Sequence, residues 1–138
     1  MKIKTITFCV VVVCFFSTRA YAQSDPTVVV TRFFQEHNKS GIDQALSTAF
    51  ATNQWIGEQK DSIDSLKAQL NNIVKLLGKY QGYELIETKK IKDSYLIQIY
   101  LVKFERQPLR YTFVFYKPNT AWQLQNFEYG ADVAGYLK

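Results

Sequence analysis

The hydrophobic pattern of this chain changes its period near Gly78, and this change restricts the fold more than any other feature. Before Gly78, apolar residues recur every three or four positions, which is the spacing of an amphipathic helix. After the segment "GKYQGY", apolar residues recur with a period near two, which is the spacing of a strand. Helices followed by strands predict an α+β fold.

Three helices are predicted before the change in period. The first extends from Asp25 to Gly41, because an Asp-Pro pair suits a helix start and glycine suits a helix end. The second starts at Ile42, and "TNQWIG" interrupts it. The third spans Asp61–Gly78 and carries one clear apolar stripe.

Four strands are predicted after the change in period. The connections between them are short, so neighbouring strands should run antiparallel, as a meander. "GKYQGYEL" before the first strand is interpreted as a plain connection, with a partner-binding loop as the alternative. The strands are expected near Tyr83–Ile91, Ser94–Glu105, Leu109–Lys117 and Ala121–Tyr129.

The central hairpin is predicted to turn at residues 106 and 107. Phe104 then faces Leu109, and one face of the pair becomes almost wholly apolar. The same register places Lys103 opposite Arg110, which is an unfavourable pair of like charges. We expect the apolar face to pack against the helices.

The opposite, outer face of this sheet also carries apolar residues where a solvated face should be polar. Contiguous exposed apolar area commonly marks an interface, so we expect a homodimer through this face. The residues predicted to form the dimer interface are Ile97, Ile99, Leu101, Val114 and Tyr116.

Residues 1–22 have the layout of a cleavable signal peptide. A basic start precedes an apolar run of eleven residues, "ITFCVVVVCFF", which is too short to span a bilayer, and small residues follow at Ala20 and Ala22. We expect export to the periplasm or beyond the cell, with one domain over residues 23–138. A lipoprotein is disfavoured because Val13, which is not a small residue, precedes Cys14.

Removal of this segment changes the charge and the cysteine content. Both cysteines leave, and the 17 basic residues fall to 14 against 12 acidic ones, so the net charge falls from +5 to +2. We therefore expect no disulfide and no nucleic-acid partner. No second apolar run is long enough to cross a membrane.

The supply of reactive residues limits catalysis. His37 is the only histidine and the mature chain lacks cysteine, so we expect no histidine-rich metal site, no cysteine nucleophile and no cofactor. His37 lies on the apolar stripe of the first helix, which favours a partly buried or carbonyl-capping histidine. The acidic residues at helix starts, such as Asp43 and Asp61, suit the helix dipole. We expect no catalytic residues.

A small group of aromatic and polar residues is the candidate ligand site. Tyr100 and Tyr111 are predicted to lie close together on the core face, where a buried hydroxyl needs a partner. An apolar mouth with a few polar groups has the character of a ligand site, although plain core packing is the alternative. The candidate ligand-binding residues are Trp55, Gln98, Tyr100, Tyr111 and His37.

Two stretches resemble the nuclear-transport-factor-2-like superfamily, which includes ketosteroid isomerases and SnoaL-like cyclases of cystatin-like fold. "GIDQALSTAFATNQW" resembles its second helix, and "YLIQIYLVKFERQPLRYTFVFYKPNTAWQLQNFEY" resembles its closing hairpins. The resemblance covers most of Val28–Tyr129. It implies a cone in which a curved sheet wraps around helices, often with a cavity at the open end and often as a dimer.

We therefore expect an exported, non-catalytic binding module that holds a small apolar or amphipathic ligand in the cone. One alternative is a homodimeric interaction protein that acts through the outer face. Another is a lyase or isomerase, because enzymatic members of this superfamily place an acid or a His–Asp pair inside the cone.

Overall fold

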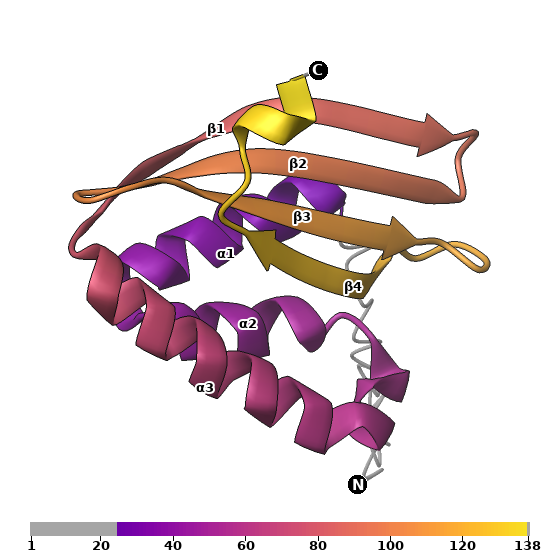
Figure 1. Ribbon diagram of the computed structural model, residues 1–138. Coiled ribbons are helices and arrows are strands. Elements are labelled where there is room, and N and C mark those ends of the chain that lie inside the picture. The colour runs from indigo at the N-terminus through magenta and orange to yellow at the C-terminus, as the bar shows by residue number, and fades with distance from the viewer. Residues whose placement is uncertain (1–24, 138) are drawn as a thin grey trace, which may run out of the picture.

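The computed structural model describes residues 25–137 and shows three α-helices followed by a four-stranded antiparallel sheet (Figure 1). The helices lie on one face of the sheet, which is curved and does not close. The predicted α+β class and the order of its elements are confirmed. The signal-peptide prediction lies outside the described residues.

The helix boundaries follow the local sequence signals. In α1 (Pro26–Ser40), the N-cap Asp25 accepts a hydrogen bond from the backbone of Thr27 at 2.8 Å. Gly41 follows with φ 91°, a conformation that suits glycine. The remaining helices are α2 (Ile42–Phe50), the 3-10 helix η1 (Gln54–Gln59) and α3 (Lys60–Leu77).

The sheet is a meander with the order β1-β2-β3-β4. Its first strand begins at Tyr80, inside the segment that the sequence pattern assigns to a connection. Gly82 adopts φ 114° beside a register shift between Tyr80 and Gly82, so the glycine makes a bulge within the strand. The strands are β1 (Tyr80–Ile91), β2 (Tyr95–Phe104), β3 (Leu109–Tyr116) and β4 (Gln123–Gly130).

The predicted register of the central hairpin is wrong by two residues. Tyr100 pairs with Tyr111, and Val102 pairs with Leu109. A shift of two preserves the face of every side chain, so the predicted apolar face is still the inner face. The predicted contact between like charges does not form, because the observed register pairs Arg110 with Leu101, and Lys103 bonds to Glu84 at 2.7 Å.

Contacts with α3 and β1 explain this shift. The backbone N–H of Glu105 donates to the carbonyl of Lys79 at 3.1 Å, and that of Arg106 donates to the carbonyl of Leu77 at 3.0 Å. The end of β2 is thus tied to the chain that enters β1, and the connection to β3 is longer than a tight turn.

The core lies between α1, α2 and the inner face of the sheet. Phe33 of α1 is fully buried and its ring meets those of Tyr111, Phe113 and Phe127. α3 packs against α2 as a more peripheral helix. Of its apolar stripe, only Leu70 and Leu77 are buried, and Ile63, Leu66, Ile73 and Val74 are half-buried.

The outer face carries a separate apolar strip. Ile99 and Val114 are 3% and 7% exposed, and neither belongs to the inner core cluster. Ile97 and Leu101 are half-buried, and Tyr116 is 40% exposed. Among residues 25–137, no helix combines the length and the apolar character that a membrane span requires.

Candidate functional site

The structure brings together three of the five candidate ligand residues. Tyr100 and Tyr111 lie opposite each other on β2 and β3, and the ring centroid of His37 is 6.4 Å from that of Tyr111. Gln98 lies two pairs further along the sheet, on the same face and opposite Phe113. These residues reach one inner face because alternate strand positions point the same way.

Trp55 is not part of this group. It lies on η1, its side chain is 60% exposed, and among the described residues its ring does not pack on the rings of His37, Tyr100 or Tyr111. The break after α2 placed it near a bend, as the sequence indicated, but the bend faces solvent. The ligand-site prediction for Trp55 therefore has no contact in the structure that supports it.

His37 is buried because it lies on the apolar face of α1. It follows Phe33 by one helical turn, and its ring packs against Tyr80 at 4.6 Å and Phe104 at 5.9 Å between centroids. Burial disfavours the charged imidazolium and lowers the pKa of His37 from 6.5 to about 4. The ring is therefore neutral near pH 7.

The polar atoms of His37 and Tyr111 lack partners within the described chain. The hydroxyl of Tyr111 is buried without a hydrogen bond, and neither ring nitrogen of His37 bonds to any other residue; a contact with the backbone of His37 itself only partly offsets the effect of burial on its pKa. Burial also raises the pKa of Tyr111, so its hydroxyl keeps its proton. Each buried group without a partner costs about 1–3 kcal/mol, so two neighbouring ones need an explanation.

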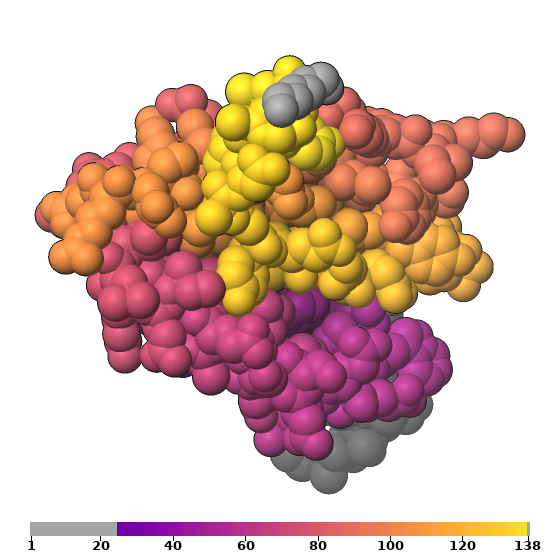
Figure 2. All heavy atoms as spheres, in the orientation of Figure 1, coloured from indigo at the N-terminus to yellow at the C-terminus, as the bar shows by residue number. Residues whose placement is uncertain are grey.

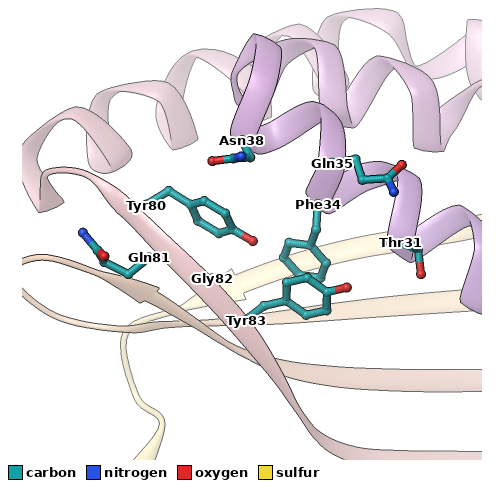
Figure 3. A pocket seen from close by; sticks show the side chains of 8 residues that line it. All are labelled: Thr31, Phe34, Gln35, Asn38, Tyr80, Gln81, Gly82 and Tyr83. Carbon is teal, nitrogen blue, oxygen red and sulfur yellow. The ribbon is translucent and has the colours of Figure 1, made fainter.

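A surface groove of about 480 Å³ lies between α1 and the start of β1. The aromatic part is Phe34 stacked on Tyr83, with ring centroids 3.7 Å apart and planes within 9°. Polar side chains from α1 line the other side (Figure 3). The lining residues are Thr31, Phe34, Gln35, Asn38, Tyr80, Gln81, Gly82 and Tyr83.

Tyr80 connects this groove to the buried polar pair. Its half-buried ring lines the groove and also packs on the ring of His37. Burial, with a smaller effect of Tyr83, raises the pKa of Tyr80 to about 12, so it too is neutral. The ring of Tyr80 therefore contacts both the groove and His37.

The centre of the cone is filled by the protein's own side chains. Tyr111, Phe113 and Phe115 are each 0% exposed, and Phe33 packs against the first two. Of the surface grooves in the described chain, which include one of about 520 Å³ lined by Arg32 and Trp122, the groove beside Tyr80 is the one that borders His37. The sequence pattern assigned "GKYQGY" to a connection, and its glycine between two tyrosines is the signal that could have indicated the groove.

The arrangement offers hydrogen bonds from neutral groups. His37 in its neutral form presents one N–H donor and one acceptor nitrogen, and a tyrosine hydroxyl presents both functions. Neither nitrogen of His37 meets a carboxylate in the described part of the chain. Over residues 25–137, no cluster of His, Cys, Asp and Glu has the arrangement of a metal site.

Searches of protein-family models, curated proteins and solved structures found no match to this chain. The resemblance to the nuclear-transport-factor-2-like superfamily therefore stays a prediction, and the site is interpreted from its own geometry.

Proposed function

We propose that this protein is an exported, non-catalytic binding module for a small amphipathic molecule. The ligand's flat apolar part lies in the groove against Phe34 and Tyr83, and its polar group reaches His37 and Tyr111 after Tyr80 rotates. One observation carries the proposal: the unpartnered polar atoms of His37 and Tyr111 lie directly behind a groove lined with aromatic rings.

The polar group of the ligand should be uncharged. His37 and Tyr111 are neutral near pH 7, and the rings around them are apolar. A charged ligand group would lose its hydration there without an opposite charge to replace it. A hydroxyl, carbonyl or amide loses less and gains the hydrogen bonds that His37 and Tyr111 offer.

Titration with small aromatic probes tests this proposal. Benzyl alcohol and benzamide are the neutral probes, and benzoate and benzylamine are charged probes of similar size. We expect NMR shift changes for the neutral probes at the amides of Tyr80 and Tyr83 and at the His37 ring. The charged probes should leave the His37 ring unchanged.

Two conservative variants separate the polar contacts from the groove. Tyr111→Phe and His37→Leu should each weaken binding of benzyl alcohol by about three- to tenfold, the value of one or two neutral hydrogen bonds. Tyr116→Phe removes a hydroxyl on the outer face and serves as the matched control. Equal affinity in all three variants would show that His37 and Tyr111 do not contact the ligand.

A second function, homodimerisation through the outer face, is favoured by a different observation. Ile97 and Leu101 keep part of their surface exposed beside the buried Ile99, and Tyr116 flanks them. A self-complementary contact would bury this strip. Sedimentation of the chain against a Leu101→Lys variant tests it, because a charge at the centre of the contact should abolish the dimer. A dimer that survives this substitution would place the interface elsewhere.

A further inference from the structure

The C-terminal segment crosses the outer face of the sheet. After β4 it continues into the 3-10 helix η2 (Ala134–Leu137), which lies on the side opposite the helices (Figure 1). In the space-filling view it covers part of the strands (Figure 2). Two hydrogen bonds hold it: the hydroxyl of Tyr136 donates to Glu87 at 2.9 Å, and Arg110 donates to the carbonyl of Asp132 at 3.1 Å.

Tyr136 is the central contact of this segment. Its ring lies 5.2 Å from Nζ of Lys89 and 5.5 Å from Cζ of Arg110, distances at which a cation attracts an aromatic face. Glu87 is the strand partner of Ile99, and Arg110 is the strand partner of Leu101. The side chain of Tyr136 therefore spans from β1 to β3 over the apolar strip.

The segment is held by polar contacts at the surface and has little apolar anchoring. No residue of η2 is buried, and Leu137 is 73% exposed. The bond from Tyr136 is partly buried and the bond from Arg110 is exposed, and cation–aromatic contacts near the surface are weak. Detachment of the segment is therefore the least costly way for this fold to uncover its outer face.

We propose that the C-terminal segment is an intramolecular cap, and that a second copy of the chain occupies the outer face when the cap detaches. This inference rests on the outer-face interface proposed above. The charges support a second copy as the occupant. Detachment frees Arg110 and uncovers the exposed ion pair of Glu87 and Lys89, whose atoms lie 3.4 Å apart, and an isologous contact can set Arg110 of each copy against Glu87 of the other. Nε of Arg110 already lacks a hydrogen bond within residues 25–137.

Three full-length variants test the cap. Tyr136→Ala removes the ring and its hydroxyl, and the dimer dissociation constant measured by sedimentation should fall about tenfold or more. Tyr136→Phe keeps the ring over Lys89 and Arg110 but loses the bond to Glu87, so its decrease should be smaller. Leu137→Ala is the control, and its dimer dissociation constant should equal that of the unchanged chain.

The outcomes separate the cap from the dimer. A dimer of equal strength in the unchanged chain and in Tyr136→Ala overturns the cap and leaves the outer-face dimer in place. A monomer in every variant at the highest concentration overturns both. A stronger dimer in Tyr136→Ala that Leu101→Lys abolishes supports both.

Discussion

Buried polar groups are hydrogen-bonded at one end of the interface between the helices and the sheet, and lack partners at the other end. Near β4, Asn53 is 5% exposed and both ends of its amide are used. Its Nδ2 donates to the carbonyl of Leu124 at 3.0 Å, and its Oδ1 accepts from the backbone of Trp55 at 3.0 Å. Thr52 adds a bond from its hydroxyl to Ala49 and accepts one from Leu124.

Near β1, His37 is equally buried, at 5% exposed, and neither of its nitrogens has a hydrogen-bond partner outside its own residue in the described chain. The hydroxyl of Tyr111 likewise has no hydrogen-bond partner in the described chain, and the residue is 0% exposed. Paired groups such as Asn53 fix how α2 meets β4. Unpaired groups cost stability, and proteins accept such a cost most readily at sites of function.

The largest expected difference between the two ends is the pH response of His37. Its pKa is 6.5 when unfolded and about 4 when folded, so the unfolded chain binds the proton more tightly. The free energy of unfolding is therefore not reduced by His37 above pH 6.5. As the pH falls from 6.5 to 4, it decreases by about 3 kcal/mol because the unfolded chain takes up the proton. Urea unfolding across this range should show the loss.

His37→Leu should remove this part of the pH dependence while the carboxylates still titrate. Parallel stability curves for the two chains between pH 6.5 and pH 4 would show that His37 is not buried as a neutral ring.

Substitution of Asn53, at the end near β4 where the polar groups are paired, should have the next largest effect on stability. Asn53→Ala leaves the carbonyl of Leu124 and the N–H of Trp55 without their partner, so the free energy of unfolding should fall by about 2–3 kcal/mol. Asn72→Ala, on the exposed face of α3, is the control and should change stability by less than about 0.5 kcal/mol. Similar values for the two variants would mean that Asn53 does not fix this junction.

Thr52→Val tests the same end on a smaller scale. The substitution keeps the shape but deprives the N–H of Leu124 of its acceptor, so chemical denaturation should show a loss of about 1 kcal/mol. Thr48→Val, on the same stretch of chain, makes the same change at a weak exposed bond of 3.4 Å and should cost less. A larger loss of stability in Thr48→Val than in Thr52→Val would show that the bond from Leu124 to Thr52 does not stabilise the end near β4.

Much of the fold could be predicted from local signals. Asp25, Gly41 and Gly78 mark helix ends by their own conformational preferences, and the alternation in β2 and β3 assigns their faces. The register could not be predicted in this way, because it depends on backbone bonds from Glu105 and Arg106 to residues before β1. Those contacts join parts of the chain that no local pattern connects.

The candidate site was predicted in part for a similar reason. The apolar stripe of α1 indicated that His37 is buried, and the strand pattern placed Tyr100 beside Tyr111. Tyr80 was assigned to a connection, because the bulge at Gly82 interrupts the alternation that marks a strand. The contact of Tyr136 with β1 and β3 has no signal in hydropathy, since it consists of one hydrogen bond and two cation–aromatic contacts.

Replacement of a single hydroxyl tests whether the polar pair at the β1 end is free for a ligand. Tyr111→Phe removes only a buried oxygen that has no partner in the described chain. Its free energy of unfolding in urea, measured without ligand, should rise by about 1 kcal/mol, because an uncompensated desolvation is relieved. A fall of about 1 kcal/mol instead would show that the hydroxyl already has a partner inside the folded protein, and the site proposed here would not exist.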